Sequence, residues 1–367
     1  HIILNKSSRL MKTIQAKDFS FAGEPVYIGI DVHKKQWTVS IMTTLRDHKT
    51  FVQPPEPEKL VRYVRENFPG AQYYSVYEAG FCGFWIHEAL SKEGLHNIVV
   101  NPADVPTSDK EKKQKYDHVD SRKLCKDLRS GVLKGIHVPD LQQQHDRELV
   151  RLRKKLVTDI TRRKNRIKST LHYYGISIPA TFPETQWSLK FIQWLKEIEF
   201  PVSTGNAVLN FLIQDLEYLL ASKRSVSRRL LILANEERYK DRVKLLRTIP
   251  GVGLIGGLTF LTELGDITRF KNVDHLCSYV GLIPNIHSSG DTSITGRLTS
   301  RKNLYVQPIL LQCAWKAASI DPILLKTYHQ LCQRMKGQQA IIRIARKLLN
   351  RIRFVLITRQ AYQLKMI

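Results

Sequence analysis

The chain has 367 residues, and its 58 lysines and arginines outnumber 33 acidic residues, which gives a net charge of +25. This excess predicts a polyanionic partner such as nucleic acid, because cations that bind phosphates release condensed counterions. No apolar run approaches the roughly 18 residues of a membrane span, and the cysteines lack CxxC spacing. We therefore expect a reduced cytoplasmic protein, neither membrane-bound nor built on disulfides or zinc.

The first part of the chain alternates between strand and helix patterns. The apolar runs YIGI and WTVSIMT predict two strands on either side of a turn at Asp31–Lys35. Further elements are expected in the order helix 57–67, strand 71–78, helix 84–93, strand 97–102, loop 109–116 and a helix from Asp117. This order predicts a mixed sheet flanked by helices.

Four carboxylates stand at the ends of these elements. Asp31 ends a buried strand and Glu78 ends another, while Asp117 and Asp120 lie three residues apart at a helix start, on one helix face. Carboxylate oxygens suit hard divalent ions, and two Mg²⁺ ions can clamp the attacking and leaving oxygens of a phosphodiester. Taken singly, each acid could instead cap a helix or end a solvated strand.

Two histidines, His33 and His118, adjoin these acids in the sequence. Such a histidine could bind the metal or carry a proton. Strand and helix alternation is expected to turn each one away from its acidic neighbour, so neither is predicted to take part.

The motifs YIGIDVHKK, YEAG and KYDHVDSRKL resemble the amino-terminal domain of the DEDD transposases, the insertion-sequence family numbered 110 with its 1111 branch. The resemblance implies an RNase H-like fold similar to that of the Holliday-junction resolvase RuvC. It also implies that Asp31, Glu78, Asp117 and Asp120 are the catalytic, Mg²⁺-binding acids. Tyr116 departs from the family, where a small residue is common, with no expected effect on the metal.

The middle of the chain is predicted to be helical and basic. Residues 151–168 carry nine cations and one acid, and leucines recur at spacings of three and four between Leu209 and Leu233. The leucines predict a coiled-coil hairpin or dimer seam, or equally a helix packed in a bundle. The candidate contacts to nucleic acid in the basic helix are Arg151, Arg153, Lys154, Lys155, Arg162, Arg163 and Lys164.

A third region opens with TIPGVGLIGGLTFLTELGD, which resembles a helix-hairpin-helix. In that motif, glycines such as Gly251 and Gly253 let backbone N–H groups approach a phosphate. A turn between two helices also needs glycine for its geometry alone. The following segment, GLIPNIHSSGDTSITGR, has no strong periodicity and is predicted to be a loop.

The resemblance extends through HLCSYVGLIPNIHSSGDTSITGRLTSRKN, where a serine before a glycine is the family's proposed nucleophile. That residue is Ser289, with Ser288 as the fallback; from the residues alone, a serine that stabilises a turn is favoured. A serine needs a base or metal to activate it, here expected to be the carboxylate–metal site. Arg297, Arg301 and Lys302 could hold the scissile phosphate or make generic backbone contacts, and Lys302 replaces the glycine of the family's K-x-G-N run.

The expected function is that of an insertion-sequence transposase or site-specific recombinase acting on element ends and target DNA. By resemblance, such enzymes are homo-oligomers (dimers or tetramers), associate with the nucleoid, and in some cases use a structured guide RNA. The alternatives are a Holliday-junction-type endonuclease that uses only the carboxylates, and a non-catalytic binding protein. Five regions are expected: a disordered leader 1–23, a RuvC-like domain 24–140, a basic helical linker 141–240, a mostly α-helical transposase domain 241–330 and a basic helical tail 331–367.

Overall fold

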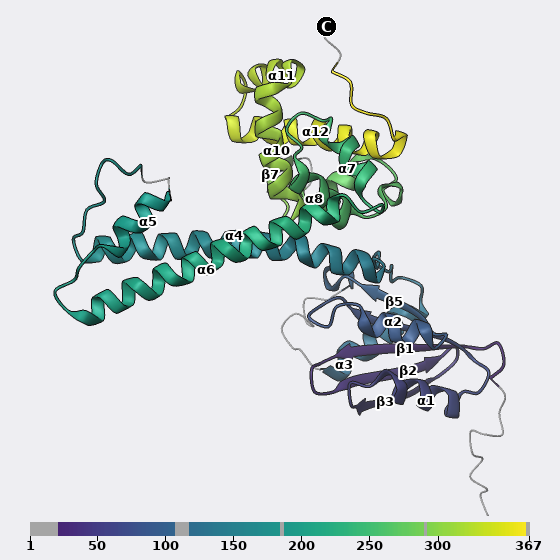
Figure 1. Ribbon diagram of the computed structural model, residues 1–367. Helices are drawn as coiled ribbons and strands as arrows, with labels where there is room; N and C mark the ends of the chain where they lie inside the picture. The colour runs from purple at the N-terminus through teal and green to yellow at the C-terminus, as the bar shows by residue number, and fades with distance from the viewer. Residues whose placement is uncertain (1–20, 107–116, 184–186, 290–291, 365–367) are drawn as a thin grey trace, which may run out of the picture. The chain divides into compact units, whose positions relative to one another are not determined.

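A computed structural model describes residues 21–106, 117–183, 187–289 and 292–364 (Figure 1). Side chains at 117–118 and 285–297 lie outside the described part, as do most of the expected leader and the expected loop 109–116. The chain divides into two compact units, His1–Val138 and Pro139–Ile367. Each unit has its own hydrophobic core.

The amino-terminal unit is built on a five-stranded sheet with the order β3-β2-β1-β4-β5. β1 pairs antiparallel with β2, which pairs antiparallel with β3, whereas β1, β4 and β5 run parallel. The predicted mixed sheet is thereby confirmed, and it is compatible with an RNase H-like start. The strands are β1 (Pro25–Val32), β2 (Trp37–Thr43), β3 (Asp47–Gln53), β4 (Gln72–Glu78) and β5 (His96–Val100).

Helices cover both faces of this sheet. On one face Ile28 and Ile30 of β1 pack with Leu60 of α1 and Ile86 of α2. On the other face Leu124 of α3 packs among valines of β4 and β5. The elements are α1 (Pro57–Asn67), α2 (Trp85–Lys92), η2 (Pro102–Asp104) and α3 (Asp117–Arg129).

β3 is the one strand of this five-stranded sheet that the sequence pattern did not predict. Five of its seven residues are polar, and most of its side chains are exposed because it lies at the edge of the sheet. An edge strand buries little on either face, so its sequence carries a weak alternation of apolar and polar residues.

The carboxy-terminal unit begins with a long helical hairpin, in which α4 (Leu141–Tyr173) packs against α6 (Ser203–Ala234). The short helix α5 (Leu189–Lys196) adds Leu195 to the apolar core at the far end of the hairpin. Leu209 and Leu216 are buried in this core with Ile167 of α4, and Leu230 joins the main core. The predicted leucine seam therefore packs inside the chain, against α4.

The remaining helices surround one apolar core that includes Phe260, Leu310 and Ile344. The basic tail contributes an amphipathic helix, α12, which buries Leu348 and Ile352 in this core. No described helix is both long and apolar enough to cross a membrane. The elements are α7 (Lys240–Arg247), α8 (Leu254–Leu264), η3 (Ile267–Arg269), α9 (Val273–Val280), β6 (Pro284–Ser289), β7 (Thr292–Leu298), α10 (Val306–Ile320), α11 (Pro322–Cys332) and α12 (Gly337–Thr358).

The expectation of a loop after α9 was wrong, because this segment forms the β6–β7 hairpin. Ser288 pairs with Ser293 and Ser289 with Thr292, so the strands are antiparallel and only two residues separate them. Those two residues are Gly290 and Asp291. A glycine followed by aspartate between two short β-prone runs is a hairpin signal, and it outweighs the weak periodicity of the strands.

Candidate active site

Two of the predicted acids lie side by side where two central strands of the amino-terminal sheet end. We call this place, at the carboxyl ends of β1 and β4, the site edge of the sheet. β1 and β4 are parallel neighbours, and the last paired residues are Ile30 and Tyr77. Asp31 and Glu78 are the next residues on these strands, so their backbones are adjacent where both strands end. The carboxyl ends of parallel strands are the usual place for a site in such sheets.

Helix α3 lies directly on β1 and brings its first turn to the same edge. A Cβ atom built on Gly29 would lie 2.1 Å from the carbonyl oxygen of Ser121 and 2.5 Å from the nitrogen of Cys125. Only glycine permits this approach. The hydroxyl of Ser121 also lies 2.9 Å from that of Ser40, which pairs with Gly29.

The direction of α3 follows from contacts at its other end. Arg129 Nη1 donates to the carbonyl oxygen of Thr43 at 3.2 Å, and Thr43 pairs with Val26 near the start of β1. α3 therefore runs antiparallel to β1, so its first turn lies toward the end of β1. Asp120 belongs to this first turn.

Asp31 and Glu78 also share a face of the sheet. Gly29 faces α3, and Asp31 is two residues further along, so its side chain is on the same face. Val76 packs with Leu124 of α3, and Glu78 is two residues after Val76. Both carboxylates therefore point to the side of the sheet that α3 covers.

The complete four-carboxylate set stays a prediction. The side chain of Asp117, the first residue of α3, lies outside the described part. Among the side chains that are described, no three of the His, Cys, Asp and Glu type lie close enough together to hold a metal ion. What the structure brings together is the backbone frame: the ends of two parallel strands and the first turn of one helix.

The sequence reasoning was wrong about the direction in which the His33 side chain points. Its Nε2 lies 3.1 Å from Oδ2 of Asp31. Residues i and i+2 at the end of a strand point to the same face, so alternation brings His33 toward Asp31 and not away from it. His118 has no described side chain.

The thiol of Cys125 lies behind this edge, between α3 and β1. It donates to the carbonyl oxygen of Tyr27 at 3.1 Å. Burial raises the pKa of Cys125 to about 12, so the thiol stays neutral and fills space as a small apolar group.

Ser289 is the last residue of β6, and its side chain is not among those described. Gly281, just before the hairpin, has φ +85°, a conformation that favours glycine. A Cβ atom added at Gly281 would lie only 2.2 Å from Cβ of Lys302, so the two residues are packed closely at the base of the hairpin. Gln307 Nε2 donates to the Gly281 carbonyl oxygen at 2.7 Å. Arg301 and Lys302 follow β7 and are exposed.

The two glycines of the PGVG turn have different surroundings. Gly251 has φ +85°, and a Cβ there would lie 2.3 Å from the carbonyl oxygen of Cys313 in α10. Packing against α10 therefore accounts for Gly251. Gly253 immediately precedes α8 and has open space around its Cα, so it is the one that a phosphate could approach.

Several of the basic residues predicted to bind nucleic acid have partners inside the unit. Arg151 makes a bidentate ion pair with Glu263, at 2.6 Å and 2.9 Å, and its contact to nucleic acid stays a prediction. Lys164 lies 5.1 Å from the ring centroid of Trp187. Further partners are Ser227 for Arg153 (3.2 Å), the carbonyl oxygen of Leu304 for Lys154, Asp215 for Arg163, Glu148 for Lys155 (3.6 Å) and Asp159 for Arg162 (3.4 Å).

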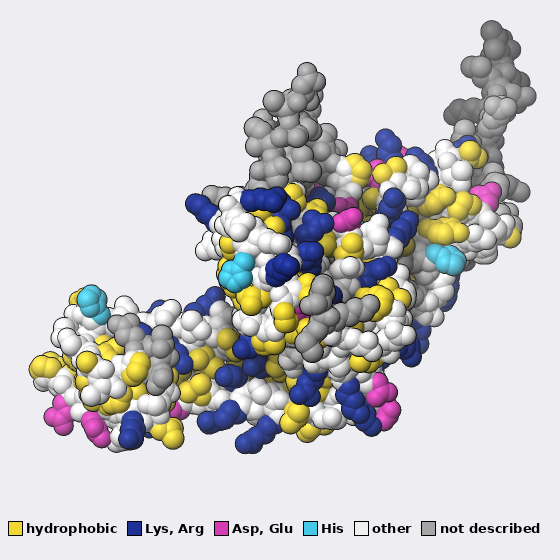
Figure 2. Space-filling view, turned by 90° about the horizontal axis from the view of Figure 1, so that it is seen from above, with side chains coloured by type: hydrophobic (Ala, Val, Ile, Leu, Met, Phe, Trp, Pro, Cys, Tyr) yellow, Lys and Arg dark blue, Asp and Glu magenta, His cyan; other side chains and the backbone are white. Residues whose placement is uncertain are grey.

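Two exposed cations of α4 border an open groove of about 830 Å³ along the hairpin. Arg162 and Arg166 line it with Tyr173 and Tyr174, and only the first of these arginines was predicted. Figure 2 shows many Lys and Arg side chains on the visible face of the molecule. Exposed cations beside exposed rings are typical of surfaces that bind nucleic-acid strands.

Comparison with known proteins decides the family. Residues 28–176 match a transposase family model of the DEDD type, and residues 243–330 match the transposase IS116/IS110/IS902 family. The chain belongs to the IS110 family of transposases. This IS110-family transposase is therefore an enzyme that acts on DNA.

Individual relatives agree with this family. The protein y4qE of Sinorhizobium fredii is 25% identical over 295 residues, which are 79% of this chain and 71% of its own. The transposase for insertion sequence element IS1111A of Coxiella burnetii is 23% identical over 318 residues, 85% of this chain and 80% of its own. The pilin gene-inverting protein of Moraxella bovis is 32% identical over 117 residues, 30% of this chain and 35% of its own.

Proposed function

We propose that this transposase cuts and rejoins DNA strands with a Mg²⁺ site formed by Asp31, Glu78, Asp117 and Asp120, and with Ser289 as the nucleophile. The observation that carries the proposal is the edge where β1, β4 and the first turn of α3 meet. Carboxylate oxygens at such an edge fit a hard divalent cation, which would polarise the phosphate and a nearby hydroxyl.

In the proposed reaction, Ser289 Oγ forms an ester bond to the scissile phosphorus as the bond to one deoxyribose oxygen breaks. The serine proton passes to a nearby base and the departing oxygen gains a proton. Attack by a DNA hydroxyl on the ester reverses these changes and rejoins a strand. Arg297, Arg301 and Lys302 follow the serine and would hold the phosphate's negative charge.

DNA binding along the helical hairpin is part of the same proposal. Lys155, Arg162 and Arg166 are exposed on α4, and cations there would contact phosphates without reading sequence. Gly253 would add a backbone N–H contact at the start of α8. A structured guide RNA is a further proposed partner, because a basic surface binds RNA as well as DNA. The protein is also proposed to act as a homo-oligomer, dimer or tetramer.

Trapping of a covalent protein–DNA adduct tests the serine and the acids together. We expect the wild type to form an adduct on an element-end substrate with Mg²⁺, and Ser289→Ala and Asp120→Ala to form none. Ser288→Ala is the matched control and should keep the adduct. Strand cleavage that persists in Ser289→Ala without an adduct would instead support the endonuclease that uses only carboxylates.

A further inference from the structure

A fully buried carboxylate joins three elements in the carboxy-terminal unit. The side chain of Glu263, near the end of α8, has no exposed surface. It accepts hydrogen bonds from Arg151 of α4 and, at 3.1 Å, from Nδ2 of Asn303. Burying a carboxylate is costly unless it is paired, so both donors are needed to stabilise it.

Tyr279 of α9 closes the same network. Its hydroxyl donates to the backbone carbonyl oxygen of Glu263 at 3.2 Å and lies 3.4 Å from Nδ2 of Asn303. The ring of Tyr305, just past Asn303, lies 4.5 Å from the Arg151 guanidinium. The network therefore spans α4, α8, α9 and the segment that leads into α10.

Asn303 divides its two amide atoms between two tasks. Its Oδ1 accepts from the backbone nitrogens of Tyr305 at 2.9 Å and Val306 at 2.8 Å, which starts helix α10. Its Nδ2 donates to Glu263. Only Oδ1 of Asn303 contributes to the cap on α10. The hydrogen bond from Nδ2 of Asn303 to Glu263 is therefore not needed for the cap.

The bond between Asn303 and Glu263 lies at the end of the segment that immediately precedes α10. Lys302 packs on Gly281, next to the start of β6, and Thr299 N donates to the Ile283 carbonyl oxygen at 3.0 Å. The segment 299–303 is therefore attached to the hairpin base at one end and to Glu263 at the other.

We propose that Glu263 and Asn303 are positioning residues that hold the Arg301–Lys302 segment, and with it the base of the β6–β7 hairpin, in the geometry needed for strand cleavage. The inference rests on the proposed role of Ser289 in this hairpin. Fixing a nucleophile and its phosphate-binding cations within a few tenths of an ångström governs the rate of attack more than the affinity for substrate.

The variant Asn303→Ser separates the two tasks of the amide. Serine still caps α10, because its hydroxyl can accept from the same backbone nitrogens, but it cannot reach Glu263. We expect the rate of adduct formation at saturating DNA to fall about tenfold or more, with the DNA concentration for half-saturation unchanged. A purely structural role would instead lower the melting temperature and affect all steps together.

Asn272→Ser is the matched control. Asn272 caps α9 through the same kind of bond, from His275 N to its Oδ1 at 2.8 Å, and no bond to Glu263 is among its described contacts. We expect its adduct rate to equal that of the wild type. If Asn303→Ser also keeps the wild-type rate, the positioning role is refuted.

A second readout does not depend on the chemistry. Loss of the Glu263 bond should speed trypsin cleavage after Arg301 and Lys302 in folded Asn303→Ser, because local opening exposes the backbone. Unchanged cleavage would contradict the proposal. If the wild type forms no adduct at all, the proposed serine chemistry fails instead, and the proteolysis result still decides whether Glu263 and Asn303 hold this segment.

Discussion

At the residue scale, the candidate active site depends on one glycine that carries no chemistry. Gly29 lets the backbone of α3 lie against β1, and this contact brings the first turn of α3, which includes Asp120, toward the end of β1. A methyl group there would overlap the backbone of Ser121 and Cys125, and backbone atoms cannot move aside as a flexible side chain can.

We predict that Gly29→Ala lowers the free energy of unfolding by about 2–3 kcal/mol, because α3 must shift away from the sheet. Chemical denaturation measures this change. Gly80→Ala is the control, since a Cβ at Gly80 meets nothing within 4 Å, and it should leave stability nearly unchanged. Equal stability of the two variants would show that α3 does not pack on β1 as described.

A second residue, Asp321, stabilises the carboxy-terminal unit through charge. Its Oδ2 accepts from Arg351 at 2.6 Å and from Tyr362 at 3.1 Å, and its Oδ1 caps α11 at Leu324 N. Burial by itself would raise the pKa of Asp321, but the bonds from Leu324 and Arg351 outweigh it, and the pKa lies below its ordinary value.

The pH dependence of unfolding follows from this shift. The unfolded state takes up the proton first as the pH falls, so the stabilisation is present above about pH 4 and is lost below it. Asp321→Asn should cost about 3 kcal/mol at pH 7, by leaving Arg351 without its counter-charge, and should lack this acid-induced loss. Denaturation midpoints between pH 2 and 7 test this; parallel curves for the two proteins would contradict it.

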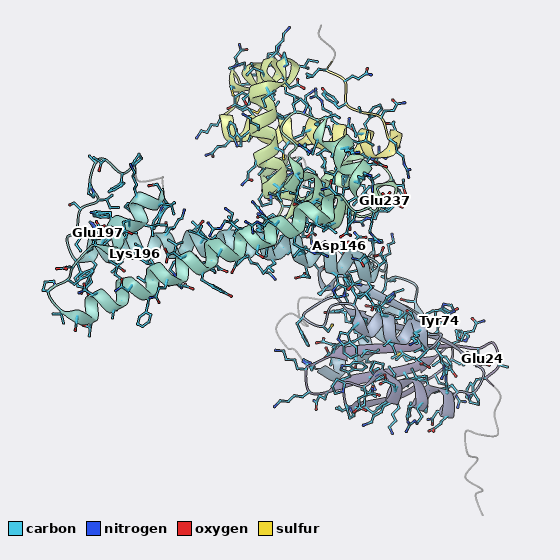
Figure 3. All side chains as sticks on the ribbon, viewed as in Figure 1. Glu24, Tyr74, Asp146, Lys196, Glu197 and Glu237 are labelled. Atoms are coloured by element: carbon cyan, nitrogen blue, oxygen red, sulfur yellow. The ribbon has the colours of Figure 1, made fainter. Side chains whose placement is uncertain are left out.

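At the element scale, the two halves of α4 have different surroundings. The first half is held by contacts inside its own unit, whereas the second half carries exposed basic residues. Asp146 near the start of α4 (Figure 3) accepts from the Tyr239 hydroxyl at 2.7 Å, and Arg151 further along pairs with Glu263. These contacts fix the first half of α4 to its own unit. The exposed cations Arg162 and Arg166 lie further out, beside the groove.

We predict that Arg166→Gln weakens DNA binding to a similar extent for all sequences and lowers the slope of log affinity against log salt by about one. Filter binding or fluorescence titration at several salt concentrations measures both. Lys196→Gln removes the same charge from the same hairpin, but Lys196 pairs with Glu217 at 2.8 Å. It should change neither quantity, and an equal effect of both variants would refute a specific surface at the groove.

At the scale of the whole molecule, the proposed acids and the proposed serine lie in different compact units. The carboxy-terminal unit has its own continuous core, including Phe260, Leu310 and Ile344, so it meets the requirement for folding alone. Chemistry that uses both sites requires both units.

We therefore predict that residues 139–367, produced alone, fold with a single cooperative thermal transition but form no DNA adduct. Circular dichroism and the trapping assay measure the two properties. A gradual, non-cooperative transition would show that this unit depends on the other for its fold. An adduct formed by the fragment would show that Ser289 acts without the carboxylates.

The sequence by itself determined the strands and helices around the acids and the family. The strands that carry Asp31 and Glu78 near their ends, β1 and β4, are rich in apolar, β-branched and aromatic residues, and such patterns are local properties that can be read directly. The β6–β7 hairpin was missed although its Gly-Asp signal is local, and β3 was missed because an edge strand buries too little to leave a pattern.

Only the tertiary structure decided the roles of residues of the same type, such as the arginines of α4 and the glycines of the PGVG turn. It showed that Arg151 pairs with Glu263 while Arg166 faces the groove, and that Gly251 packs on α10 while Gly253 stays open. These distinctions depend on partners far away in the chain, and a charge or a glycine looks the same in sequence whichever partner it has.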